Sequence, residues 1–242
     1  HHAKKLPTIL APKTVKRILA HCDKPWDLFF GLQYGCGLRL GEVLDLRIHD
    51  LDFERGVLFI RAGKGDKDRQ VPLPRSLFER LKIHLETRRE LWRGDLSRGC
   101  ARVDLPHALA RKIAGADLAW EWQHVFGAAR PLRYPETNEL RRWRPLETVV
   151  RAALRDAAHA AGVIGRIHPH LLRHCYATHL VELGVPLAEI KELMGHARLE
   201  TTMVYLHVCS PAESLRSPLD RDVNVVDNGA VRAVYLESSN SV

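Results

Sequence analysis

The sequence predicts a mainly α domain with a small antiparallel β-sheet (α+β). Three observations support this class. Most segments with periodic apolar residues have helical spacing, and one pair of short apolar runs flanks a glycine-rich turn. The third is size, because 242 residues with 45% hydrophobic content suffice for a large buried core. These features exclude a disordered or collagen-like chain.

The first quarter of the chain is expected to be helical. Apolar residues between 11 and 34 suit two helices that are separated near Pro25. A glycine-rich break follows at 35–37, and a short helix restarts at Arg39. An arginine in that place lies beside free backbone N–H groups, which makes the start of the helix a natural anion site.

A β-hairpin is expected next. Residues 56–61 and 69–73 have the composition of strands, and they bracket a Gly-Lys-Gly turn with Lys64 at its tip. The remaining periodic segments predict helices. We expect these helices at 76–92, 146–161, 171–183, 187–194 and 201–208.

Charge and hydropathy restrict the class of partner. The net charge is +8, and residues 217–242 contribute −2 of it, so the body of the chain favours a polyanion such as nucleic acid. No apolar run reaches the roughly 18 residues of a membrane span, and no secretory signal is recognisable. We therefore expect a cytoplasmic protein with no membrane partner. Five cysteines without C-x-x-C spacing predict free thiols.

Four separated segments carry residues suited to binding and attacking a phosphodiester. Each is common by itself, because arginine occurs on any basic surface and Gly-Lys-Gly in many turns. The segments are G-L-R-L-G-E with Arg39 and Glu42, G-K-G with Lys64, H-L-L-R-H with His170 and Arg173, and G-H followed by T-T-M-V-Y with His196 and Tyr205.

In this order and with these spacings, the segments resemble the catalytic domain of the tyrosine recombinases, the phage-integrase and Xer superfamily. The resemblance runs from about residue 6 to residue 220 and implies one active site without metal, ATP or other cofactor. Its implied catalytic residues are Arg39, Lys64, His170, Arg173, His196 and Tyr205, with Glu42 as the acidic companion of Arg39.

The chemistry explains why these residue types are needed. A tyrosine hydroxyl has a pKa near 10, so Tyr205 needs help to lose its proton. Arg39 and Arg173 are suited to bind the non-bridging phosphate oxygens. A planar guanidinium group can donate two hydrogen bonds to these oxygens at once and stabilise the negative charge of the transition state. His196 adds a further hydrogen bond. The expected products are a 3′-phosphotyrosyl bond and a free 5′-hydroxyl.

The resemblance also assigns the proton transfers. His170 is expected to assist proton removal from Tyr205, and Lys64 to protonate the departing 5′ oxygen. His174, in the same motif, is interpreted as a packed helix histidine.

These residues also allow other interpretations. Further tyrosines are alternative nucleophiles, and the histidines at 168, 170, 174 and 179 could be a zinc cluster, although no carboxylate or cysteine accompanies them. Residues 180–196 also fit a helix-turn-helix, which would leave Lys64 and Tyr205 unexplained. The alternative tyrosines are Tyr34, Tyr134, Tyr176 and Tyr235.

About 50 residues, at 93–145, separate the helix at 76–92 from the next one. The runs L-P-H-A-L-A-R-K and A-W-E-W-Q-H-V-F in this insert, and the later L-R-S-P-L-D, resemble integron integrases. That resemblance implies recognition of folded single-stranded hairpins whose extruded bases stack on aromatic rings. The candidate DNA-binding residues of the insert are Trp120, Trp122, His124, Arg141, Arg142, Trp143 and Arg144.

The two tryptophans at i and i+2 equally suit a small core, so both interpretations of Trp120 and Trp122 stay open. A departure from the integron group also matters. The group has paired histidines after Arg-Arg, where this sequence has Trp143 and Arg144.

We therefore expect a catalytic domain over residues 1–216, with the insertion at about 93–145, and a C-terminal tail over 217–242. The N-terminal core-binding domain of such recombinases is expected to be absent from this chain. The expected function is integration and excision of gene cassettes at attI and attC sites, at the bacterial nucleoid, in a synaptic tetramer of protomers. The alternatives are a Xer or phage-type recombinase acting on duplex core sites and a non-catalytic DNA-binding regulator.

Overall fold

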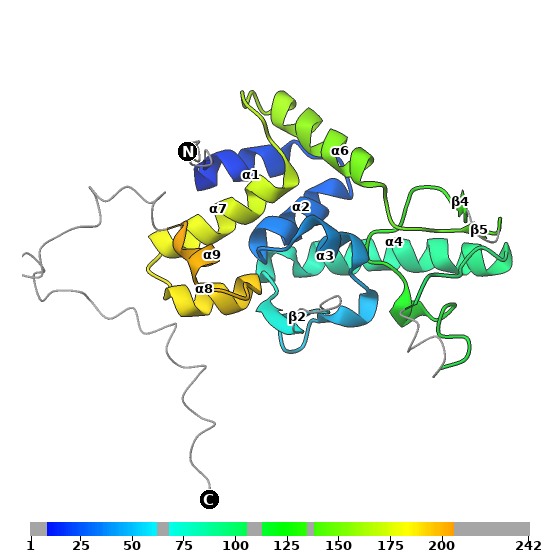
Figure 1. Cartoon of the computed structure of the whole chain (residues 1–242). Coiled ribbons are helices and arrows are strands. Elements are labelled where there is room, and N and C mark those ends of the chain that lie inside the picture. The colour runs from blue at the N-terminus through cyan, green and yellow to red at the C-terminus, as the bar shows by residue number, and fades with distance from the viewer. Residues whose placement is uncertain (1–8, 62–67, 106–112, 135–137, 206–242) are drawn as a thin grey trace, which may run out of the picture. The chain divides into compact units, whose positions relative to one another are not determined.

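A computed structural model describes residues 9–61, 68–105, 113–134 and 138–205, which are mainly helical with two small antiparallel sheets (Figure 1). The helices are α1 (Pro12–Ala20), α2 (Trp26–Gly35), α3 (Leu40–Asp45), α4 (Phe78–Ser97), α6 (Glu147–Ala160), α7 (Pro169–Glu182), α8 (Leu187–Met194) and α9 (Glu200–Met203). The strands are β1 (Leu51–Asp52), β2 (Val57–Ile60), β3 (Arg69–Pro72), β4 (Leu132–Arg133) and β5 (Leu140–Arg141). Short 3₁₀ helices are η1 (Ile48–Asp50), η2 (Arg75–Leu77) and η3 (Trp120–Trp122).

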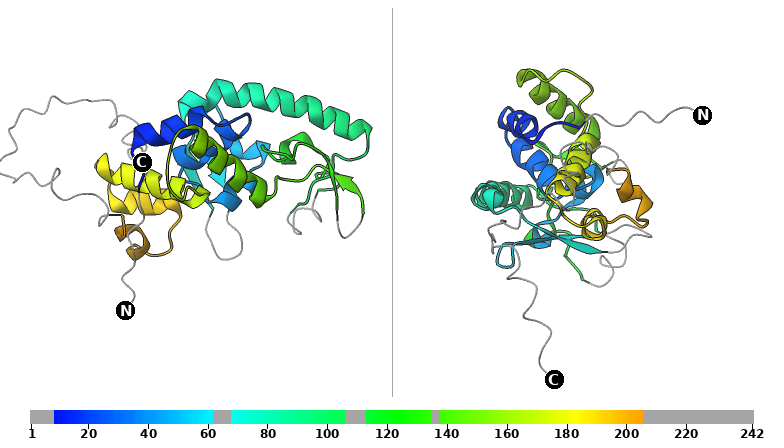
Figure 2. Two further views of the ribbon diagram at one scale, coloured as in Figure 1. Left: turned by 90° about the horizontal axis from the view of Figure 1, so that it is seen from above. Right: turned by 90° about the vertical axis from the view of Figure 1, so that its left-hand side faces the viewer.

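Helix α2 forms the centre of the core. Its sequence is apolar on nearly all sides, which is the pattern of a helix surrounded by other elements. It packs against α1, α3, α6 and α7, which the two views of Figure 2 show gathered around it. Phe29 and Phe30 are fully buried there, and Phe126 of the insert packs edge-on against Phe29. The core therefore joins the helical body to the insert.

The predicted helices are confirmed with shifts at their ends, except for the one predicted at 201–208, of which residues 206–208 lie outside the described part. Helix α4 continues to Ser97, five residues beyond the expected end. Its buried residues include two charged ones, Arg88 and Asp95. Helix α7 begins at Pro169, and the side chain of His168 accepts a hydrogen bond from the Leu171 amide at 3.2 Å. Helix α9 ends at Met203, so Tyr205 lies just past it rather than inside it.

The predicted hairpin is confirmed in its strands. Strands β2 and β3 pair antiparallel with Leu58 opposite Val71, and β1 adds a third strand that the sequence did not predict. Two residues are too few for a period-2 pattern, which explains that omission. The tip of the hairpin, with Lys64, lies outside the described residues.

The insert joins the C-terminal half of α4 to α6 and carries η3 and the hairpin β4–β5, which was not predicted (Figure 1). Hydrogen bonds hold it to α4. Trp92 donates through Nε1 to the carbonyl of Leu118 at 2.9 Å, and the ring of His84 contacts the carbonyl of Val125 at 2.9 Å. The insert is thus hydrogen-bonded to α4 at two positions, about two helical turns apart.

The described residues belong to one compact unit, and the chain after residue 205 lies outside them, so the domain division at residue 216 stays a prediction. In the described part no helix is both long and apolar enough to cross a membrane. The four cysteines that are described are free thiols, as expected. They are Cys22, Cys36, Cys100 and Cys175.

Candidate active site

The Glu42 carboxylate organises one side of the site. Arg39 precedes α3, and its backbone N–H and its Nη1 donate to Glu42 Oε2 and Oε1, each at 2.8 Å. Arg69, at the start of β3, donates to the same two oxygens at 2.8 and 2.9 Å. Burial alone raises the pKa of Glu42, but the hydrogen bonds from Arg69 and Arg39 outweigh burial and leave the pKa below its usual value. Glu42 is therefore an anion at neutral pH.

The same arginines connect the sheet and α3 to the end of α8. Arg39 Nη2 donates to the carbonyl of Gly195 at 3.0 Å, and Arg69 Nε to that of Leu193 at 2.9 Å. Gly195 has φ +61°, and a Cβ there would lie 2.9 Å from Arg69 Nη1, so this position requires glycine for both reasons. Arg69 was not among the predicted site residues, because nothing in the local sequence separates it from other basic strand residues.

Arg173, on α7, is the most deeply buried cation of the site, at 1% exposure. Its guanidinium donates to the carbonyls of Gly37, at 2.6 Å, and Met194, and it lies 3.8 Å from Glu42. Burial lowers the pKa of Arg173 to about 10, with Glu42 opposing that shift, so the group keeps its charge at pH 7. Both predicted arginines thus lie around one carboxylate.

Tyr205 lies against α7 and α8 with only 3% of its surface exposed. Its hydroxyl is hydrogen-bonded to Nδ1 of His174 at 3.0 Å. Burial raises the pKa of Tyr205, and the charge of Arg173 acts in the opposite direction. The proton therefore stays on the tyrosine oxygen in this arrangement.

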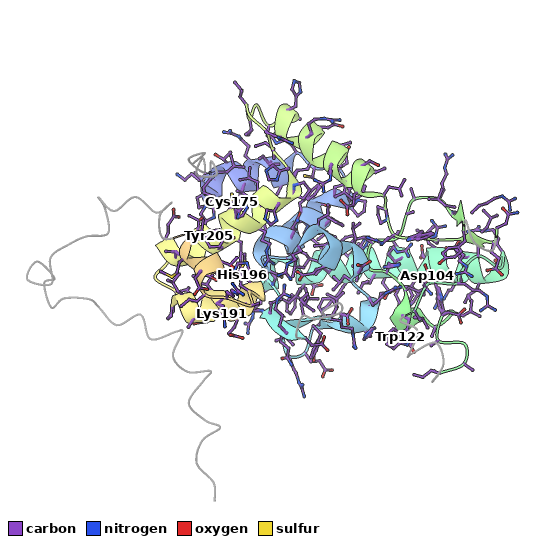
Figure 3. The ribbon with its side chains drawn as sticks, viewed as in Figure 1. Asp104, Trp122, Cys175, Lys191, His196 and Tyr205 are labelled. Atoms are coloured by element: carbon purple, nitrogen blue, oxygen red, sulfur yellow. The ribbon has the colours of Figure 1, made fainter. Side chains whose placement is uncertain are left out.

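His196 lies beside Tyr205, as Figure 3 shows, with the two rings nearly parallel and their centroids 6.4 Å apart. Its Nδ1 is hydrogen-bonded to Oγ1 of Thr202 at 2.9 Å. Burial and the nearby arginines, Arg173 foremost, lower the pKa of His196 to about 4. The imidazole is therefore neutral at pH 7.

The histidine that contacts the tyrosine is His174, not His170. His170 is exposed in the first turn of α7, and its ring packs edge-on against His174 with 4.3 Å between centroids. Burial, then His170 and His168, lower the pKa of His174 to about 4. The interpretation of His174 as a packing residue is therefore incomplete. The available signal was its spacing of four residues from His170, which places both on one face of α7.

Two predicted DNA contacts in the insert are corrected by burial. His124 is 5% exposed, and burial, then Arg47, keep its pKa well below the usual value. Arg142 is 4% exposed and donates to both oxygens of Asp95 and to the carbonyls of Ala128 and Ala129. Neither side chain is available to a base or a phosphate, because packing against α3 and α4 covers them.

The tryptophans of the insert are half-buried. Trp120 packs on Trp92, with the Arg89 guanidinium 5.1 Å from its ring. Trp122 lies 4.1 Å from the His49 ring and lines a hollow of about 490 Å³ that also includes Arg61 and Asp104. Figure 3 shows Trp122 and Asp104 in the insert, away from the labelled Tyr205.

The last three candidates already have partners in the protein. Trp143 stacks on Tyr134, with 4.9 Å between ring centroids. Arg141 pairs with Glu139 and Asp104, and Arg144 with Asp45 at 3.2 Å. Their predicted contact with DNA stays a prediction.

Within the described residues, no three histidine, cysteine or acidic side chains gather so that they could hold a metal ion. Lys64 lies outside the described residues, although Arg69, at the start of the adjoining strand β3, is part of the site. The site therefore combines a tyrosine, two neutral histidines and three arginines around one carboxylate. Such a set suits binding of a phosphodiester and attack on it by the tyrosine oxygen.

The comparisons with known proteins agree with this chemistry. The model of the phage integrase family matches residues 8–210. An integrase/recombinase of Escherichia coli is 38% identical over 219 residues, which cover 90% of this chain and 65% of that protein. Tyrosine recombinase XerA of Pyrococcus furiosus is 32% identical over 228 residues, or 93% of this chain and 65% of that protein.

Solved structures share the fold. The XerA recombinase aligns with a TM-score of 0.59 and 23% identity over 86% of this chain and 61% of that one. The XerH site-specific recombinase, bound to a palindromic difH substrate after cleavage, has the same TM-score and identity over 84% of this chain and 50% of that one. The chain thus spans about 65% of the length of the curated relatives it matches.

Proposed function

This chain belongs to the phage integrase family of tyrosine recombinases, and we propose that it is the catalytic domain of a site-specific DNA recombinase. The proposed reaction cleaves and rejoins DNA strands through a 3′-phosphotyrosyl intermediate. The observation that carries the proposal is the position of the Tyr205 hydroxyl. It is hydrogen-bonded to the neutral imidazole of His174, and Tyr205 lies close to Arg173 and His196.

In the proposed reaction, Tyr205 Oη attacks the phosphorus atom and the bond from phosphorus to the 5′ oxygen breaks. Arg39 and His196 donate hydrogen bonds to the non-bridging oxygens. Arg173, whose Nη atoms donate to the carbonyls of Gly37 and Met194, adds its buried positive charge to their stabilisation. Glu42 supports this arrangement by holding the arginines in place. Because the phosphotyrosyl bond retains the energy of the broken ester, a second 5′-hydroxyl can reverse the step on another strand.

Two protons move in this scheme. His174, with its own proton on Nε2, accepts the Tyr205 proton at Nδ1, a transfer that becomes favourable as the tyrosine oxygen bonds to phosphorus and the arginines stabilise the developing negative charge. His170, whose ring packs edge-on against that of His174, is proposed to relay this proton to solvent. Lys64 is proposed to donate a proton to the 5′ oxygen as it leaves.

The finer proposal is an integron integrase, which would integrate and excise cassettes at attI and attC sites with other protomers in a synaptic tetramer. The insert between α4 and α6 supports it, because half-buried Trp122 lines an open hollow in which an extruded base could stack. The relatives named XerA favour the alternative, a Xer-type recombinase that acts on duplex core sites. In either case the DNA substrate implies action in the bacterial cytoplasm.

The test is a suicide substrate, nicked so that the released fragment diffuses away and the covalent adduct accumulates. We expect an adduct with the parent chain and none with Tyr205→Phe, whose DNA binding should be nearly unchanged because only one oxygen is lost. Tyr34→Phe is a matched control, since Tyr34 is also hydrogen-bonded to an α7 histidine, His179, at 2.8 Å. An adduct with Tyr205→Phe would refute the assignment.

The same assay separates the finer alternatives. A folded single-stranded attC-like hairpin and its duplex form are compared at equal concentration. Preference for the hairpin supports the integron proposal, and cleavage of the duplex alone supports the Xer type. A non-catalytic regulator would form no adduct with either substrate.

A further inference from the structure

A cavity of about 390 Å³ lies between the start of α2, the middle of α4 and insert residues 127–129. This volume falls in the range of small-molecule sites. None of its lining residues takes part in the proposed recombination chemistry. Its apolar walls include Pro25, Leu28, Ile83, Leu91 and Ala128.

The cavity contains a buried cation, Arg88 of α4, which is 4% exposed. Its Nε and Nη1 atoms are buried, and among the described residues they have no hydrogen-bond partner. Gly127 leaves room for this guanidinium, because a Cβ at that position would lie 2.5 Å from Arg88 Nη2. A buried donor without an acceptor is unfavourable, and a buried charge without a counter-charge more so.

Asp95, the acidic group whose charge acts on Arg88, already accepts hydrogen bonds from other arginines. Asp95 accepts hydrogen bonds from both Nε and Nη2 of Arg142, and a third from Arg98. Arg142 also repels Arg88: burial, then the charge of Arg142, lower the pKa of Arg88 to about 10, so Arg88 stays charged at pH 7. The cluster thus holds more positive than negative charge.

The opposite wall does not supply the missing negative charge. Asp27 is paired there with Arg80, and Lys24 adds another cation. Three cations and one carboxylate therefore line a cavity that is otherwise mostly apolar.

We propose that this cavity binds a small amphipathic anion, a carboxylate on an apolar body, whose charged end accepts hydrogen bonds from Arg88. The carboxylate provides the acceptor that the protein does not, and guanidinium–carboxylate hydrogen bonds are among the stronger ones in proteins. The apolar body lies against the aliphatic walls. This ligand site lies apart from Tyr205 and goes beyond the proposed recombination.

The first test uses the whole 242-residue chain and a panel of arylalkanoic and alkanoic acids, including 4-phenylbutyrate, each paired with its neutral amide. Titration calorimetry or ligand-observed NMR measures binding. We expect at least one acid to bind, and at least about tenfold more tightly than its amide. If no acid binds, or if acids and amides bind equally, the proposal is wrong.

The second test uses Arg88→Met, which keeps an unbranched, flexible side chain and removes the guanidinium group with its charge. The preference for acid over amide should disappear, whereas Arg93→Met, an exposed arginine of the same helix, should keep it. An unchanged preference in Arg88→Met overturns the proposal.

Thermal unfolding provides an independent readout. Without ligand, Arg88→Met should melt at or above the temperature of the parent, because the variant no longer buries an uncompensated charge. The binding acid should raise the melting temperature of the parent but not of Arg88→Met. A lower melting temperature for Arg88→Met than for Arg93→Met without ligand would make Arg88 a structural residue and refute the site.

Discussion

Two carboxylates in this molecule gather arginines, one in the candidate active site and one beneath the insert. Glu42 accepts hydrogen bonds from Arg39 and Arg69, with Arg173 close by. Asp95 accepts them from Arg142 and Arg98. In both clusters, hydrogen bonds from arginine keep the pKa of the acid below its usual value although burial opposes this. In local chemistry the two clusters are nearly the same.

They differ in what lies beside them. Each cluster has one exposed and one deeply buried arginine, Arg39 and Arg173 around Glu42 and Arg98 and Arg142 around Asp95. A tyrosine and two neutral histidines lie next to the Glu42 cluster. Around Asp95 the further contacts are the Cys100 thiol and the backbone carbonyls that accept from Arg142. A cluster of arginines around an acid therefore does not by itself indicate a phosphate site. A nucleophile beside the cluster does.

The largest effect that would test this contrast is on stability. Arg142→Ala should lower the free energy of unfolding by about 3–5 kcal/mol, because it breaks a buried ion pair. Arg144→Ala, which removes a half-exposed partner of Asp45, should change it by less than about 1 kcal/mol. Urea unfolding measures both. If Arg142→Ala keeps its stability and loses DNA affinity, Arg142 contacts DNA and the contrast fails.

The next effect is on catalysis. Arg39→Ala should slow cleavage of the suicide substrate at least about 100-fold, or about 2.7 kcal/mol, the scale of losing one preorganised donor to the transition state. Its urea midpoint should stay close to that of the parent, because the side chain is partly exposed. Cleavage should not respond to EDTA. A requirement for magnesium would contradict the proposed chemistry.

A third prediction asks whether any part of the insert reads DNA. Trp122→Ala should weaken binding of a hairpin with extruded bases about 5- to 150-fold, since stacking is worth about 1–3 kcal/mol per base. A hairpin without extruded bases should bind the variant and the parent alike. Trp120→Ala is the matched control, because Trp120 is also half-buried but does not line this hollow. Equal losses on both hairpins would make Trp122 a packing residue.

The smallest effect distinguishes the clusters by pH. The folded-state pKa values of His174 and His196 are about 4, below the usual 6.5, so the unfolded chain binds more protons between these values. Stability should therefore fall as pH decreases from about 6.5 to 4, by on the order of 1 kcal/mol per histidine after solvent screening.

Hydrogen exchange locates this loss of stability. Amide protection in α7 and α9 should decrease before that in α4, because Asp95 stays ionised to lower pH. In the variant that combines His174→Gln and His196→Gln, the slope of stability against pH should flatten. An unchanged slope would show that other groups govern the acid response.

Most helices, the strands β2 and β3 and four residues of the candidate site could be predicted from the sequence alone. The helices around Pro25, the hairpin strands and the start of α3 at Arg39 depend on apolar spacing, proline and glycine within a few residues, so local patterns suffice. The order of the four motifs was enough to propose Arg39, Arg173, His196 and Tyr205 as one site. These four residues lie in one region of the fold.

Tertiary structure decided which side chains meet and which are covered. Three hydrogen-bonded pairs lie far apart in the sequence. Arg69 and Glu42 are separated by 27 residues, His174 and Tyr205 by 31, and Arg142 and Asp95 by 47. Such contacts depend on how helices and strands pack. A residue's own neighbours in sequence carry no information about that packing. For the same reason the sequence predicts DNA contacts for His124 and Arg142, because composition reveals charge and aromaticity but not burial.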